Sequence, residues 1–167
     1  MPLHIREETP ADHAAIHALT ETAFRHAPHT SHTEQRIVDA LREAGALAIS
    51  LVAEHGGEIV GHVAVSPVAL SDGSTGWFGL GPISVAPARQ KQGIGAMLMK
   101  LALDALRARG AAGCVVLGDP AYYARFGFVP EATLVLPGVP AEYFQAIALC
   151  GEVPAANVHY HTAFETG

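Results

Sequence analysis

The segment Val85–Leu98 combines the end of an apolar strand, a polar loop with two glycines and the start of an apolar helix. The first backbone N–H groups of a helix have no partner within it, and they carry the positive end of the helix dipole. Gly93 and Gly95 remove side chains that would keep a ligand away from those groups. The segment therefore predicts an anion site that suits a phosphate group.

The residues around the glycines separate this loop from two common phosphate-binding motifs. A Walker loop needs Lys and then Ser or Thr after its last glycine, whereas Ala96 and Met97 follow Gly95. A dinucleotide fingerprint needs a further glycine where this chain has Leu98. A glycine-rich turn that binds no ligand is the simpler alternative for the segment taken alone.

The pattern Gln90-x-x-Gly93-x-Gly95 resembles the pyrophosphate loop of the GCN5-related N-acetyltransferases, the GNAT family, in which it holds acyl-coenzyme A. The resemblance covers most of the chain, is densest over residues 79–149 and points to the YhbS-like branch of that family. It implies that backbone N–H groups surround the pyrophosphate. The residues that would do so are Gln90, Lys91, Gln92, Gly93, Ile94, Gly95 and Ala96. Lys91 is a candidate to add positive charge at a phosphate, and an exposed lysine without any contact is the alternative.

A second landmark lies downstream, where Tyr123-x-x-x-Gly127-Phe128 resembles the family's tyrosine motif at the end of a short helix. The resemblance implies that Tyr123 protonates the leaving thiolate of coenzyme A or holds its sulfur. A phenol with an ordinary pKa of about 10 keeps its proton at neutral pH, and a thiol of pKa about 8.5 leaves as an anion that accepts one. The alternative is a packing role in the core, which we expect for the neighbouring Tyr122.

Proline inside the expected strand 76–85 predicts an interruption of the sheet. Pro82 has no N–H to donate, so strand pairing should fail on one side, with a bulge assisted by Gly79 and Gly81. The resemblance implies that the pantetheine arm of the cofactor lies in the resulting gap, next to the strand that contains Cys114. It also implies an oxyanion donor among the backbone N–H groups of Ile83, Ser84 and Val85.

Two acidic residues have candidate roles in the same site. Asp119 stands where many members of the family have an asparagine near the pantetheine arm, although capping the short helix is the alternative. Glu34 is the candidate general base, because it begins a helix beside the polar connection at residues 25–32, where the family's acceptor enters. A first-turn acid favoured by the helix dipole is the alternative for Glu34, and water can also deprotonate an amine.

The histidines and cysteines predict neither a metal site nor a covalent mechanism. His26, His29 and His32 recur every third residue, and His159 and His161 would share a strand face, but no cysteine or carboxylate completes either set. The two cysteines, Cys114 and Cys150, are expected within or at the end of buried strands without a nearby base. We therefore expect no metal, no disulfide and no acyl-enzyme.

The elements that must position these residues follow from hydrophobic periodicity and turn signals. The expected fold is α/β and GNAT-like, a mixed and mostly antiparallel sheet of about six or seven strands flanked by helices, with an antiparallel meander turning at Gly56-Gly57. Strands are expected at 3–7, 47–54, 58–65, 76–85, 114–117, 128–136 and 142–149, and a short alternating segment at 158–164. Helices are expected from residue 10 to 24, at 33–43, at 94–109, where Met97 and Leu101 join the apolar face, and briefly after Asp119.

Size and composition predict one domain with a substantial core. The chain has 167 residues, of which 50% are hydrophobic and 16% charged, and we expect a single domain with its core at 3–150 and a C-terminal extension at 151–167. The formal charge of −6, without a basic cluster, disfavours nucleic acid or an anionic membrane as partner. The absence of a signal core or an apolar span predicts a cytoplasmic protein, and exposed strand edges make a homodimer an open expectation.

The resemblance thus implies an N-acetyltransferase that transfers an acetyl group from acetyl-CoA to an amine by direct attack. The acceptor would be a small-molecule or peptide amine, and acetyl-CoA or another acyl-CoA the co-substrate. Two alternatives stay open: a CoA-binding sensor or interaction module with little or no turnover, and a protein that binds ATP or NAD at the same helix start.

Overall fold

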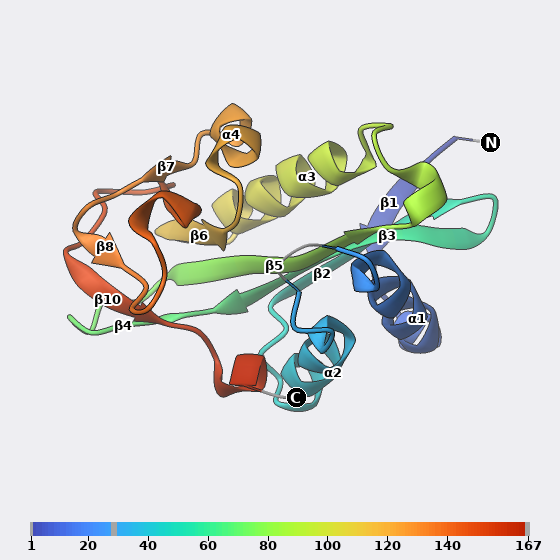
Figure 1. The fold of residues 1–167 in the computed structure, drawn as a ribbon, viewed down its shortest axis with the longest axis horizontal. Coiled ribbons are helices and arrows are strands. Elements are labelled where there is room, and N and C mark those ends of the chain that lie inside the picture. The colour runs from blue at the N-terminus through green and yellow to red at the C-terminus, as the bar shows by residue number, and fades with distance from the viewer. Residues whose placement is uncertain (1, 28–29, 166–167) are drawn as a thin grey trace.

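The centre of the molecule is a seven-stranded mixed sheet (Figure 1). The computed structural model describes residues 2–27 and 30–165. Neighbouring strands are antiparallel except β5 and β6, which run parallel. In spatial order the strands are β1 (His4–Glu7), β2 (Ile49–His55), β3 (Glu58–Pro67), β5 (Trp77–Val85), β6 (Gly113–Leu117), β9 (Phe144–Ala148) and β7 (Val129–Pro130).

Helices cover both faces of this sheet (Figure 1). The long helix α3 (Ile94–Ala108) packs on one face, and α1 (His13–Phe24) and α2 (Glu34–Glu43) pack on the other. One face of α3 is buried because apolar residues recur every four positions and so lie on one side of the helix. Those residues are Ile94, Leu98, Ala102 and Leu106. Shorter helical segments are α4 (Pro120–Tyr123) and the 3-10 turns at Pro10–Asp12, Pro87–Arg89, Ala124–Phe126, Ala141–Tyr143 and Thr162–Glu165.

The expected sheet class and antiparallel meander are confirmed. Strands β2, β3 and β5 are consecutive antiparallel neighbours, and the β2–β3 turn contains Gly56 and Gly57 with φ of 60° and 83°. The expected apolar face of α3 was wrong at two positions. Met97 is 46% exposed and Leu101 39% exposed, because the buried residues form two adjacent rows along the helix, Ile94-Leu98-Ala102-Leu106 and Met99-Leu103, and these two positions lie outside both.

The largest difference from expectation lies in the segment predicted as one strand at 128–136. It forms two separate short strands, β7 and β8 (Leu134–Val135), and these belong to different sheets. Strand β8 joins β10 (Ala156–His159) and β4 (Ala69–Leu70) in a three-stranded sheet. The break follows from Pro130, which has no N–H for a continuous ladder.

The C-terminal residues are part of the core. Val158 of β10 is fully buried in a cluster with Trp77 and Val115, and Ala163 packs against α2 residues. Cys150 was expected at a buried strand end but is exposed, because β9 already ends at Ala148. None of the helices in the described residues is long and apolar enough to cross a membrane.

Candidate active site

The sheet opens between β5 and β6. These strands pair only at Trp77–Gly113, Phe78–Cys114 and Gly79–Val115, although both continue beyond the last pair. The other edge of each strand remains paired. Strand β5 pairs with β3 as far as Val85, and β6 pairs with β9 as far as Leu117. The predicted failure of pairing is therefore confirmed, and it leaves a gap with unpaired backbone along both walls.

A bulge in β5 lies beside this gap. The β3–β5 register passes from Val65↔Leu80 to Val63↔Ile83, so two residues of β5 face one residue of β3. The two residues are Gly81 and Pro82, as the proline predicted.

The direction of the β5 amides follows from one backbone hydrogen bond and from strand alternation. The Ala86 N–H donates to the Val60 carbonyl of β3 at 2.8 Å. Because successive N–H groups along a strand point to opposite edges, those of Ile83 and Val85 point away from β3 and into the gap. The Val85 carbonyl points the same way and accepts a bond from Gln90 Nε2 at 3.2 Å. The Ser84 amide faces β3, so only two of the three expected oxyanion donors have the required direction.

The loop before α3 exposes the start of that helix. Gly93 is the N-cap residue with φ of 84°, and Lys91 has φ of 65°. Among the residues that the structure describes, no side chain caps this helix start, and its first turn has no acidic residue. The N–H groups of Ile94, Gly95 and Ala96 therefore have no partner within the helix, as an anion site requires.

A cavity of about 380 Å³ lies against this helix start. It is lined by all the loop residues of the predicted site except Gln92. The Nε2 of Gln92 donates to the Ala88 carbonyl at 3.5 Å. Three cationic side chains line it, from Arg89, Lys91 and Arg125. A second hollow of about 390 Å³ shares Ala96 and Arg125 with it and adds two more cations, Lys100 and Arg107. The local charge is thus positive although the chain is acidic overall.

Tyr122 lines the same cavity, although the sequence indicated only packing. Its hydroxyl lies 3.3 Å from the position that a Cβ at Gly95 would occupy, and the Arg125 guanidinium lies 4.7 Å from its ring centroid. Asp119 caps α4, since its Oδ1 accepts the Ala121 N–H at 2.9 Å. This contact supports the capping alternative for Asp119.

Tyr123 stands beside the end of β6. A Cβ on Gly118 would lie 2.9 Å from Cε2 of Tyr123 and 3.6 Å from its hydroxyl, so the missing side chain makes room for the ring. Burial raises the pKa of Tyr123 to about 12, and the nearby Tyr122 and Asp119 add to the shift. The phenol therefore keeps its proton over the whole physiological range.

A second tyrosine approaches the gap from the other face of the sheet. A Cβ on Gly79 would lie 2.5 Å from Cε1 of Tyr160, so this ring covers the last residue of β5 that pairs with β6. Burial raises the pKa of Tyr160, and Cys114 and Tyr123 contribute to the rise. Sequence analysis missed Tyr160, because only the path of the C-terminal segment brings it to the gap.

Glu34 is held by the loop that precedes its helix. Thr30 Oγ1 donates to both carboxylate oxygens at 2.8 Å, and the Ser31 N–H donates to Oε2 at 3.1 Å. These contacts support the helix-start alternative for Glu34, and its role as a general base stays a prediction.

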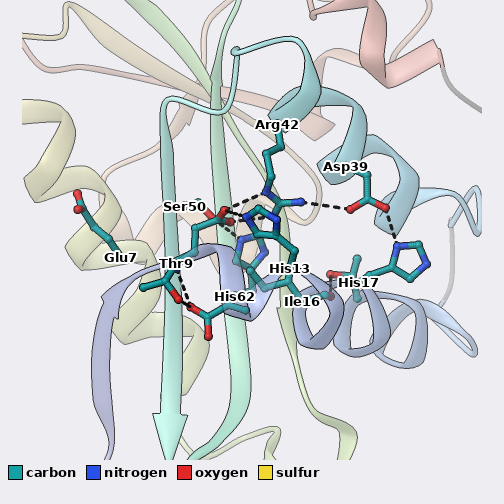
Figure 2. A network of polar contacts seen from close by, with 12 residues as sticks. Glu7, Thr9, His13, Ile16, His17, Asp39, Arg42, Ser50 and His62 are labelled. Carbon is teal, nitrogen blue, oxygen red and sulfur yellow. Dashed lines mark hydrogen bonds and ion pairs between the residues drawn. The ribbon is translucent and has the colours of Figure 1, made fainter.

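A polar cluster, defined as Glu8, His13, Arg42, Ser50 and His62, lies under α1 and α2 (Figure 2). Ser50 Oγ lies 2.7 Å from His62 Nε2 and donates to Glu8 Oε1. Arg42 donates to Glu8 at 2.8 and 2.9 Å, and His13 Nε2 lies 3.0 Å from Glu8 Oε2. Sequence analysis missed this cluster, because its five members come from five separate segments: the loop after β1, α1, α2, β2 and β3.

Strands β3 and β5 contain buried polar atoms without a hydrogen-bond partner among the described residues, and one of them belongs to His62 of the polar cluster. Within the described part of the chain, His62 Nδ1, Ser66 Oγ and Ser84 Oγ accept and donate no hydrogen bond. His62 and Ser66 are fully buried, and Ser84 is 2% exposed. Buried polar atoms in proteins are normally paired with protein or ordered water.

Among the described residues, no group of three or more histidine, cysteine, aspartate or glutamate side chains is arranged to hold a metal ion. His29, one of the three regularly spaced histidines, lies outside those residues.

Comparison with known proteins adds independent information. Residues 13–128 match the model of the Acetyltransferase (GNAT) family. The chain is 40% identical to the uncharacterized N-acetyltransferase YhbS of Escherichia coli K12 over 125 residues, which are 74% of this chain and 72% of that protein.

Two solved structures are similar over nearly the whole chain. A GNAT family acetyltransferase from Brucella melitensis, in complex with acetyl-CoA, is 48% identical with a TM-score of 0.87, covering 98% of each chain. YhbS from Escherichia coli, in complex with CoA, is 36% identical with a TM-score of 0.88, covering 98% of this chain and 92% of that one.

Proposed function

The chain belongs to the GNAT family of acetyltransferases, and we propose that it transfers an acetyl group from acetyl-CoA to an amine by direct attack. The observation that carries this proposal is the register of β5 and β6, whose pairing stops at Gly79–Val115 while both strands continue. An extended pantetheine arm can bond to the free edges there as a further strand would. The relatives crystallised with acetyl-CoA and CoA support the same ligand.

The pyrophosphate of acetyl-CoA binds at the start of α3. The free N–H groups of residues 94–96 supply donors, the helix dipole favours negative charge, and Arg89, Lys91 and Arg125 add cations. Gln90 to Gly93 form the exposed side of this site. From there the arm runs into the gap toward Tyr123.

The chemistry needs an oxyanion donor and a proton for the leaving thiolate. The inward N–H groups of Ile83 and Val85 donate to the thioester oxygen as it gains negative charge. Tyr123 donates to the sulfur. Burial raises the pKa of the Tyr123 phenol, and it also raises the pKa of a coenzyme A thiol beside it. The phenol and the thiol therefore stay comparable in acid strength.

Ligand-dependent thermal stability tests the cofactor assignment. We expect acetyl-CoA and CoA to raise the melting temperature in a concentration-dependent way, because a ligand that binds only the folded state stabilises it. ATP and NAD at the same concentrations should give no shift. The opposite pattern would show that the helix start serves another nucleotide.

A binding module without turnover is the second candidate. Release of free CoA thiol from acetyl-CoA, followed with a thiol reagent over a panel of amines, separates the two. Stabilisation by acetyl-CoA without thiol release above the buffer rate on any amine would favour the module. A neutral phenol beside the sulfur position favours the enzyme.

A further inference from the structure

The proposed transfer leaves one proton without a destination. The attacking amine must lose a proton, and Glu34 is engaged with Thr30 and Ser31. Helix α3, whose start binds the pyrophosphate in the proposed function, covers one face of the sheet, and α1 and α2 cover the opposite face (Figure 1). The polar cluster lies on that face (Figure 2).

The hydrogen bonds of the cluster determine the tautomer of His62. Arg42 and Ser50 hold the pKa of Glu8 below its usual value although burial opposes them, so its carboxylate is ionised and only accepts bonds. Ser50 must therefore give its single proton to Glu8, as the geometry indicates. Its oxygen then accepts from His62 Nε2–H, and His62 Nδ1 is left with an unprotonated lone pair.

That lone pair lies beside the wall of the gap. His62 is the register partner of Ser84 in the β3–β5 ladder, and Ser84 stands between the two residues whose N–H groups enter the gap. Paired residues on neighbouring strands extend their side chains to the same face. Neither His62 Nδ1 nor Ser84 Oγ has a hydrogen-bond partner in the part of the chain that the structure describes, and both are buried. An ordered water between these two atoms would satisfy both.

The outer end of the cluster reaches the surface. A hollow of about 260 Å³ is lined by Glu8, Arg42 and Ser50, among others. The Glu8 side chain is 14% exposed and its partner His13 is 40% exposed. The cluster thus connects a buried, unpaired nitrogen to a carboxylate in contact with solvent.

We propose, on the premise of the acetyl transfer above, that Ser84, His62, Ser50 and Glu8 form a proton relay for the acceptor amine. The ammonium form of the amine gives one proton through Ser84 or a bridging water to His62 Nδ1, and the neutral nitrogen then bonds to the thioester carbon. The C–S bond breaks as Tyr123 protonates the sulfur, and the second proton of the nitrogen replaces the one that Tyr123 gave. His62 Nε2 passes its own proton to Ser50, whose hydroxyl proton moves to Glu8. Glu8 returns it to solvent or to His13.

The burial and the charged groups around His62 favour a neutral imidazole that passes protons on, rather than one that stays positively charged. Burial lowers the pKa of His62 to about 4; Arg42 lowers it further, and Glu8 opposes the shift. Asp39 bonds Arg42 on α2, at 3.3 Å, and His13 on α1 contacts Glu8. The imidazole is therefore neutral above about pH 5 and carries charge only transiently.

Nitrogen NMR of the free protein tests the starting state without any acceptor. Two-bond ¹H–¹⁵N spectra distinguish the tautomers, and the spectrum of His62→Gln assigns the His62 signals by difference. We expect the neutral Nε2–H tautomer at pH 7, with no protonation until the pH falls toward about 4. A ring that carries its proton on Nδ1, or that is cationic at pH 7, overturns the relay.

Kinetics tests the relay in turnover, with alanine amide as the probe acceptor. We expect Ser50→Ala to slow transfer about tenfold or more, while the acetyl-CoA dissociation constant stays unchanged. Ser50→Thr should restore most of the rate, because it keeps the hydroxyl. The deficit of Ser50→Ala should shrink as the pH rises above about 8, where an α-amine is already neutral.

Thr20→Val is the matched control. Thr20 is also fully buried, and its hydroxyl donates to the Ile16 carbonyl outside the cluster, so its loss should leave transfer unchanged. If alanine amide is not acetylated, hydrolysis of acetyl-CoA is read in the same assay, since water as acceptor must also lose a proton. Wild-type rates in Ser50→Ala overturn the relay, whereas failure to bind acetyl-CoA overturns the proposed function and leaves the tautomer measurement valid.

Discussion

Two tyrosines approach the gap in the sheet from opposite faces. Tyr123 packs with the core on the α3 side, and Tyr160 packs with the cluster that contains Trp77. Each ring lies against a glycine, Gly118 and Gly79 respectively, at positions where a side chain would displace it. Two unrelated parts of the chain therefore each fix a tyrosine ring beside the strands that border the gap.

Removal of the Tyr123 hydroxyl tests its assignment at the sulfur. We expect Tyr123→Phe to lower turnover by about 100-fold while the dissociation constant of CoA changes little, because the ring and its packing remain. The measurement is thiol release from acetyl-CoA together with calorimetric CoA binding. Tyr143→Phe is a control, since that tyrosine is 47% exposed. Full activity of Tyr123→Phe across the pH range would remove Tyr123 from the mechanism.

The start of α3 and the bulged strand β5 are the two elements that shape the site. Helix α3 begins with a glycine in a left-handed conformation and without a side-chain cap, so its first N–H groups stay available. The bulge at Gly81–Pro82 turns β5 from full pairing with both neighbours to pairing with β3 alone. A ligand that bonds to both elements must carry an anion at one end and an extended arm at the other.

Substitution of Gly93 tests the helix start. A Cβ at Gly93 would meet no protein atom within 4 Å, so the side chain of Gly93→Val would extend into the space in front of the free N–H groups. We expect CoA binding to fall at least about 100-fold in calorimetry.

Gly73→Val is the matched control for backbone strain. Gly73 has φ of 83° against 84° for Gly93, and a Cβ there also meets nothing within 4 Å. Both variants therefore carry a similar strain cost of about 1–3 kcal/mol, and only Gly93→Val should lose the ligand. Equal losses in the two would assign the effect to strain.

At the scale of the whole molecule, the small sheet β4–β10–β8 packs against the strands β5 and β6 of the main sheet (Figure 1). Its residues Leu70, Val158 and Leu134 share a buried cluster with Trp77 of β5 and Val115 of β6. The C-terminal segment then continues to α2, where Ala163 packs. The segment expected as an extension therefore contributes to the global core.

A cavity in this cluster should destabilise the whole fold. Val158 is fully buried, and we expect Val158→Ala to lower the free energy of unfolding by about 2 kcal/mol. Urea titration followed by fluorescence of Trp77, the single tryptophan, measures this. Val135→Ala is the control, because Val135 on the neighbouring strand β8 is 41% exposed and should change stability little. Equal losses of unfolding free energy in the two variants would show that the buried Val158 adds no more stability than an exposed valine.

The sequence by itself determined the features that depend on neighbouring residues. The glycine loop before α3, the turn at Gly56-Gly57 and the broken pairing at Pro82 each follow from the conformations or missing donors of residues a few positions apart. The individual strands and the long helix follow from hydrophobic periodicity, which reports burial locally, whereas the class of the sheet came from the resemblance to the GNAT family.

Only the tertiary structure decided which distant residues meet. Tyr160 reaches the gap because β10 pairs with β4, and His62 meets Ser50 and Glu8 because three segments share one face under α1 and α2. Sequence spacing contains no signal for such contacts, since they depend on strand order and register. The split of the expected strand at 128–136 has a local part, the proline at 130, but only the tertiary structure decided the partners, because each half pairs with a strand more than a dozen residues away.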